Sequence, residues 1–290
     1  PAKFGFLKEL VGVRYLSSGV TLFMVFSVLS IALSALFVGN SYSYFVPEDL
    51  LSASLILKAA FPISLSVVLF SAIALFFSRF LPEIGSHAVD LKFPWKRYFN
   101  TSYSRRKTQK VWRNLALRQS IIGLSMFWLI VLLLVFIFQE QLQPSTFNLS
   151  SIFQMGIFYA VLGLIAGCIY AGKMSKAFIE TGLVPLGTAG VSISIFLISV
   201  LPSPYSFTLY FALGFFGGVF VIPMTSILLY NSKPRSAGHV VSINNAIQHI
   251  VMLAFFGFSL LLVNTFSLSL NKLFFFLGIL CLFGTIWAIL

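Results

Sequence analysis

Four polar side chains interrupt one apolar stretch of the sequence, "SAGHVVSINNAIQHIVMLAFFGF" at residues 236–258. They are Asn244, Asn245, Gln248 and His249. On a helix with about 100° per residue, they occupy an arc of about 140° on one face. Amides and a neutral imidazole donate and accept hydrogen bonds without a fixed charge. The spacing therefore predicts a face that hydrogen-bonds either to neighbouring helices or to a polar ligand.

The composition indicates the environment of the helix that carries this face. The chain has 290 residues, of which 59% are hydrophobic and 9% charged, with a mean hydropathy of +0.99. A soluble domain carries roughly a quarter charged residues. The composition therefore predicts an integral membrane protein. Its apolar runs are about 20 residues or longer and lack two-residue alternation, so we expect transmembrane helices and not barrel strands.

Hydropathy over windows of about 19 residues predicts an all-α polytopic fold with eight transmembrane helices. The expected spans are Ser18–Gly39, Ser54–Leu81, Leu117–Phe138, Ser151–Gly172, Leu183–Leu201, Ser206–Tyr230, Val240–Val263 and Lys272–Leu290. Three regions follow from this: two helices within residues 1–81, a connection over 82–116, and a six-helix bundle over 117–290.

The connection over 82–116 is strongly basic, and the other cations follow the same topology. If the first span runs outward, 17 of the 19 Lys and Arg residues fall on the inner side. The positive-inside rule then places the basic loop in the cytoplasm. The net charge of +12 is thus interpreted as a topology signal near anionic lipid heads, in preference to nucleic-acid binding.

Two helices, a cytoplasmic loop and six helices match the last two-thirds of a transporter built from two six-helix bundles. We therefore expect four further helices before Pro1, and a C-terminal extension after Leu290 is a second expectation.

The residues offer no catalytic or metal-binding constellation. All seven carboxylates lie at predicted helix ends or in loops, and the three histidines are scattered. Cys168 and Cys281 fall within apolar runs as small hydrophobic side chains. We expect no enzyme activity, no metal and no cofactor. For the polar face of residues 244–249, helix-to-helix hydrogen bonding and the lining of a substrate path both remain open, and a metal-ligand role for His249 is the weakest alternative.

Glycines and prolines mark helices that either pack closely or bend. Gly217, Gly218 and Pro223 lie in one predicted span, and Pro185 lies at the start of another. Small residues permit close contact, and a proline frees a backbone carbonyl. Packing and a gating hinge are both open for these four residues. Lys58, in the outer part of the second span, either extends to the interface or receives an anionic group such as a lipid phosphate.

Several motifs together resemble one family. They are "PAKFGFLKELVG" (1–12), "VDLKFPW" (89–95), "LRQSIIGLSMFW" (117–128), "IETGLVPLGTAG" (179–190), "GGVFVIPMTSILL" (217–229) and "SAGHVVSINNAIQH" (236–249). In this order they resemble bacterial lysophospholipid transporters, a branch of the major facilitator superfamily. The resemblance covers nearly the whole chain and places it from the loop after the fourth helix onward.

The resemblance implies a transporter that moves lysophospholipid, chiefly lysophosphatidylethanolamine, from the outer to the inner leaflet of the bacterial inner membrane. It also implies an acyltransferase–acyl carrier protein synthetase, as a partner or fused domain, that restores the second chain. The chain departs from the family at three positions: Thr225 replaces an expected Asn, Leu229 an expected Gln, and Gln248 a common acid. Thr225 therefore joins the four polar residues as a substrate-path candidate.

Three other functions are alternatives to lysophospholipid transport. The same fold could carry another small molecule such as a drug, sugar or peptide. A membrane-embedded lipid enzyme would need a catalytic Ser, His or Asp constellation or paired carboxylates. A scaffold without transport is the remaining alternative, because eight helices cannot form both halves of an alternating-access site.

Overall fold

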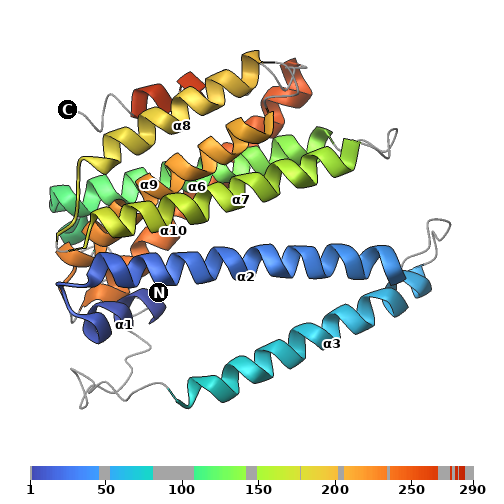
Figure 1. Cartoon of the computed structure of the whole chain (residues 1–290), viewed down its shortest axis with the longest axis horizontal. Coiled ribbons are helices and arrows are strands. Elements are labelled where there is room, and N and C mark those ends of the chain that lie inside the picture. Colours follow the sequence, from blue (N-terminus) through green and yellow to red (C-terminus); the bar gives the residue numbers. More distant parts are fainter. Residues whose placement is uncertain are drawn as a thin grey trace. The chain divides into compact units, whose positions relative to one another are not determined.

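The described residues of the chain form long helices (Figure 1). The computed structural model describes residues 2–45, 53–80, 108–141, 149–176, 178–201, 206–233, 236–266, 275, 278–279 and 281–284. Because lipid offers no hydrogen-bond partners, apolar segments of this length satisfy their backbone internally as helices. The helices are α1 (Ala2–Val11), α2 (Leu16–Phe45), α3 (Ala53–Ser78), α6 (Leu115–Gln141), α7 (Leu149–Met174), α8 (Leu183–Val200), α9 (Ser206–Asn231) and α10 (Ala237–Phe266).

Six helical segments of the described residues are long and apolar enough to cross a membrane. They are Leu16–Ser34, Leu115–Leu132, Gly156–Met174, Leu183–Val200, Phe207–Asn231 and Ala237–Phe258. The predicted all-helical membrane fold is therefore confirmed. The second predicted span coincides with α3, whose apolar part Ser64–Ser78 is shorter. Most of the eighth, over 272–290, lies outside the described residues, so the count of eight stays a prediction.

Contacts divide the chain into two compact units. One comprises residues 1–26 with 88–290, and the other comprises residues 27–87, which include the rest of α2 and all of α3. The predicted division into residues 1–81, 82–116 and 117–290 stays a prediction. The candidate site described below lies entirely in the first of these units.

Helix α9 is the centre of this unit, and its tightest neighbour is α7. Gly163 and Gly167 of α7 face Gly214 and Gly218 of α9. A Cβ at Gly163 would collide with the Phe211 carbonyl oxygen, and one at Gly214 with that of Ala160. Two small-xxx-small motifs therefore let the two backbones touch, which is how membrane helices gain dispersion contacts without a hydrophobic driving force.

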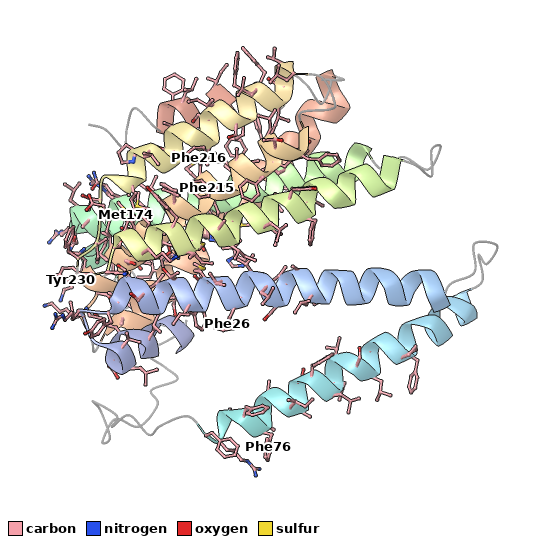
Figure 2. All side chains as sticks on the ribbon, viewed as in Figure 1. Phe26, Phe76, Met174, Phe215, Phe216 and Tyr230 are labelled. Atoms are coloured by element: carbon pink, nitrogen blue, oxygen red, sulfur yellow. The ribbon has the colours of Figure 1, made fainter. Side chains whose placement is uncertain are left out.

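Helix α8 packs on another side of α9 through its own glycines. A Cβ at Gly187 would lie 2.8 Å from the Phe220 Cβ, and one at Gly190 would overlap the Phe216 ring. Phe215, the preceding residue, instead faces α7, where its ring centroid is 5.6 Å from that of Tyr170 (Figure 2). These phenylalanines fill the seams around α9.

Helix α1 is an addition to the predicted spans. It ends at Gly12, which adopts φ +73° and donates its N–H to the Lys8 carbonyl at 3.1 Å, a left-handed C-terminal cap. Helix α1 contacts α9 and α10. Met174 and Tyr230, at the ends of α7 and α9, lie at the same end of the unit (Figure 2).

Candidate substrate site

The polar face predicted on residues 244–249 forms on α10. Asn244 and Gln248, one turn apart, are buried, while Asn245 is partly buried and His249 is exposed. The face therefore turns from the protein interior toward its edge. Helix α10 packs mainly on α6 and only slightly on α9. This packing leaves space between the polar face and α9.

Hydrogen bonds within α10 fix two of these side chains. Asn244 donates its Nδ2 to Asn245 Oδ1 at 3.3 Å. His249 Nδ1 lies 2.6 Å from the Asn245 carbonyl oxygen. A carbonyl oxygen only accepts, so Nδ1 carries the donated proton in this contact. The imidazole is thus oriented by its own helix.

The space beside this face is a cavity of about 410 Å³. Helix α2 contributes Met24, α6 contributes Leu124 and Trp128, and α9 contributes Thr225, Leu228 and Leu229. The α10 wall consists of Val241, Asn244, Asn245, Gln248, His249 and Met252. The five substrate-path candidates of α9 and α10 therefore meet around one cavity. Their role in transport stays a prediction.

Two oxygen atoms of residues that line this cavity have no hydrogen-bond partner among the described residues. Thr225 Oγ1 and Asn244 Oδ1 are both buried and unpaired, and their residues are 4% and 5% exposed. Leaving a buried polar atom unpaired costs about 1–3 kcal/mol. Among the described residues, no Lys, Arg, Asp or Glu lines the cavity. The site therefore offers neutral hydrogen-bonding groups, of which the Asn244 oxygen lacks a donor.

The three departures from the family pattern all line this cavity. Thr225 and Leu229 contribute to it from α9, and Gln248 contributes from α10. Leu229 is fully buried, so an apolar side chain covers a position where the family resemblance predicts an amide. The cavity is consequently less polar than the resemblance alone implies.

The remaining substrate-path candidate, Lys58, does not join this cavity. Its backbone belongs to α3 in the second compact unit. Its side chain lies outside the described residues, so both of its alternative roles stay predictions.

The four hinge candidates occupy two kinds of position. Gly218 lies in the α7–α9 seam, where a Cβ would be 2.6 Å from the Cys168 backbone nitrogen, and Gly217 faces Phe127 Cε2 at 3.0 Å. Both positions show close packing. Pro223 is fully buried within α9, whereas Pro185 lies in the first turn of α8, where a proline fits without breaking a helical bond. A gating role is untested for all four.

Lys8 is a residue whose part in the structure the sequence did not indicate. Its Nζ donates to the carbonyl oxygens of Tyr230 at 2.8 Å and Ser232 at 2.6 Å. These carbonyls end α9, where the helix dipole favours a cation. Partial burial lowers the pKa of Lys8. The only sequence signal was a lysine in a segment with a helical pattern, which names no partner.

A second, larger cavity of about 870 Å³ lies near the same end of α9. Arg14 is its one charged lining residue, and Ser17, Gln119, Ser120 and Asn231 are among its polar ones. Within the part of the chain that the structure describes, no group of three or more His, Cys, Asp or Glu side chains could hold a metal ion.

The described residues form six helices long and apolar enough to cross a membrane, and four of them line the cavity beside residues 244–249. This arrangement is typical of a multi-pass membrane protein of the transporter type. The profile of the Major Facilitator Superfamily matches residues 1–256, and the chain belongs to that superfamily.

Similarity to individual curated proteins indicates a narrower group within this superfamily. The chain is 24% identical over 268 residues to the lysophospholipid transporter LplT of Klebsiella pneumoniae, covering 89% of the chain and 61% of the relative. It is 26% identical over 152 residues to LplT of Cronobacter sakazakii, covering 51% of the chain and 38% of the relative. The chain thus spans about three-fifths of the length of the first relative. The resemblance to this branch is confirmed, and no solved structure matches the chain.

Proposed function

We propose that the protein transports lysophospholipid across the membrane. The observation that carries the proposal is the match along 89% of the chain to a protein named as a lysophospholipid transporter. The superfamily profile, which matches residues 1–256, includes the polar residues of α9 and α10 that share a cavity.

The chemistry of the cavity supports this cargo. A lysophospholipid such as lysophosphatidylethanolamine has a zwitterionic headgroup and one acyl chain. Neutral amides and a hydroxyl bind a zwitterion without trapping it, because no fixed charge has to be released again. Met24 of α2 and Trp128 of α6 provide apolar lining from other helices, next to which the first part of an acyl chain finds dispersion contacts.

The direction of transport and its context follow from the family resemblance. We propose movement from the outer to the inner leaflet of a bacterial inner membrane, with the basic loop over 82–116 in the cytoplasm. Reacylation by an acyltransferase–acyl carrier protein synthetase, fused or separate, would then remove the product and favour import. The protein itself would perform no chemistry and need no cofactor.

Another small molecule is the alternative cargo. An uncharged cavity of about 410 Å³ would also accept part of a drug, sugar or peptide. The relatives' names favour lysophospholipid, and uptake measurements decide between them.

The test uses the full-length protein in cells that lack their own lysophospholipid uptake. Labelled lysophosphatidylethanolamine is followed into diacyl phospholipid, and Asn245→Ala and His249→Ala are compared with the native protein. Ser242→Ala is the matched control, since Ser242 is exposed on α10, bonds back to the Gly238 carbonyl at 2.9 Å and does not line the cavity.

We expect uptake by the native protein and the control, and a loss of about tenfold in both cavity variants at equal membrane levels, as for a lost hydrogen bond of about 1.4 kcal/mol. Unchanged uptake in both variants would make the polar face a helix-packing seam. No uptake by the native protein would overturn the proposed cargo.

A further inference from the structure

Two buried oxygens without a hydrogen-bond partner among the described residues belong to residues that line the cavity on α9 and α10. Thr225 Oγ1 belongs to α9 and Asn244 Oδ1 to α10, and neither has a partner although both residues line the cavity. The Asn244 amide is oriented by the bond from its Nδ2 to Asn245 Oδ1 at 3.3 Å. Its nitrogen is therefore engaged, and its oxygen is the atom left for a ligand.

The chemistry of these atoms defines what binds there. An amide oxygen only accepts hydrogen bonds, whereas a threonine hydroxyl both accepts and donates. A ligand group that satisfies Asn244 Oδ1 must therefore donate, and Thr225 Oγ1 can accept from the same group. A phosphate oxygen would bring negative charge to the Asn244 oxygen, and among the described residues no Lys or Arg lines the cavity to offset it. The donor end of a headgroup fits beside Asn244 better than the phosphate does.

We infer that Thr225 and Asn244 form the subsite for the hydrogen-bond donor end of the lysophospholipid headgroup, an ammonium N–H or a hydroxyl O–H. This inference rests on the proposed function and assigns the headgroup's orientation within it. Trp128 on α6 lines the same cavity, and the face of an indole ring attracts an ammonium group. Both oxygens are shielded from solvent, so the donor forms charge-assisted bonds where no water competes.

Ser226 is the comparison residue for Thr225 and Asn244, because it lacks a partner but lies outside the cavity lining. Its Oγ is also buried and unpaired on α9, directly after Thr225, but Ser226 does not line the cavity. A missing partner alone is therefore no sign of a ligand. The combination of a missing partner and a cavity wall singles out Thr225 and Asn244, and Ser226 provides the matched control.

The experiment measures uptake by the full-length protein of four labelled lysophospholipids that differ only in the amine. The amine carries three N–H groups in ethanolamine, then two, one and none as methyl groups are added. The variants are Thr225→Val and Asn244→Leu, which keep the approximate shape and remove the acceptor, with Ser226→Ala as the control.

We expect native uptake to fall about tenfold or more at the last methylation, where the final donor disappears, as for a lost charge-assisted hydrogen bond. Thr225→Val and Asn244→Leu should lower uptake of the ethanolamine lipid and leave uptake of the trimethyl lipid nearly unchanged. The ratio of ethanolamine-lipid uptake to trimethyl-lipid uptake should therefore become smaller. Ser226→Ala should keep the native ratio. Asn244→Asp keeps the acceptors and adds a negative charge, so it should widen the ratio.

The outcomes separate this inference from the proposed function. Uptake of all four lipids at similar rates by the native protein overturns the inference and leaves the function standing. If Thr225→Val and Asn244→Leu both keep the native ratio of ethanolamine-lipid to trimethyl-lipid uptake, the inference is likewise overturned and the proposed function still stands. If Thr225→Val and Asn244→Leu fail to reach the membrane, the Asn244→Asp ratio decides, and an unchanged ratio overturns the inference. No uptake of any lipid by the native protein overturns the proposed function itself.

Discussion

The Lys8 ammonium donates a hydrogen bond of 2.8 Å to the carbonyl oxygen of Tyr230, 222 residues further along the chain. The contact joins the segment before the first membrane span to the end of the most buried one. With the second bond to the Ser232 carbonyl, Lys8 caps helix α9 from another element. Near Lys8, Leu7 and Val11 pack against Gly19 of α2, so α1 is held on two sides.

Replacing Lys8 should therefore weaken the fold locally. Lys8→Met keeps the aliphatic part and removes both bonds and the charge at the α9 terminus. We expect a loss of about 1–2 kcal/mol in the free energy of unfolding, measured by thermal unfolding in detergent. Lys173→Met is the control, because Lys173 is exposed in the last turn of α7. Equal effects of both variants would contradict the capping role.

The α7–α9 seam should be intolerant of a single added methyl group. A Cβ at Gly167 would collide with the Phe215 carbonyl oxygen, which is backbone and cannot rotate away. Gly167→Ala should therefore destabilise the protein by about 1–3 kcal/mol or more. Gly257→Ala on α10 should have little effect in the same unfolding assay, since a Cβ there meets nothing within 4 Å. A neutral Gly167→Ala variant would show that the seam is looser than described.

Helix α1 and the helix ends differ in how far hydropathy predicts them. Hydropathy located the spans because lipid solvation acts on each apolar segment separately, and observed bounds such as Leu183–Val200 match the predicted Leu183–Leu201 closely. Helix α1 was not predicted, because a short, moderately apolar segment resembles a loop until its partner is known. Its partner, the end of α9, is far away in the sequence, and no local pattern names it.

The site was predicted in part. Helical periodicity grouped Asn244 with Gln248 because both belong to one helix. Trp128 and Met24 were not predicted as cavity residues, because which side of α6 or α2 faces α10 depends on how the helices pack. Likewise, the sequence showed that Thr225 and Asn244 are polar, but only the fold shows that their oxygens lack partners.

Pro223 allows the packing and hinge interpretations of α9 to be separated. A proline inside a helix lacks the N–H that would bond to the carbonyl four residues earlier, here that of Val219. Pro223→Ala restores that bond and should raise the stability of the protein by about 1–3 kcal/mol in thermal unfolding. If α9 bends there during transport, the same variant should slow lysophospholipid uptake several-fold.

The control for this hinge test is Pro185→Ala. Pro185 lies in the first turn of α8, where a missing N–H breaks no internal helical bond, so stability and uptake should both change little. Greater stability of Pro223→Ala with unchanged uptake would assign Pro223 to packing alone.

Filling the cavity from α9 should test whether the unpaired Asn244 oxygen is accessible to a donor. Thr225→Asn places an amide nitrogen at the wall of the cavity of about 410 Å³, from which it can donate to Asn244 Oδ1. Pairing a buried acceptor should stabilise the protein by about 1 kcal/mol, measured by thermal unfolding in detergent. Because the added amide occupies the acceptor, uptake of lysophosphatidylethanolamine should fall at the same time.

Ser226→Asn is the control, because it introduces the same side chain one residue away. Ser226 is fully buried outside the cavity, so this variant should lower the free energy of unfolding by about 1–3 kcal/mol through overpacking. Equal destabilisation by the two variants would mean that the space beside Thr225 admits no donor.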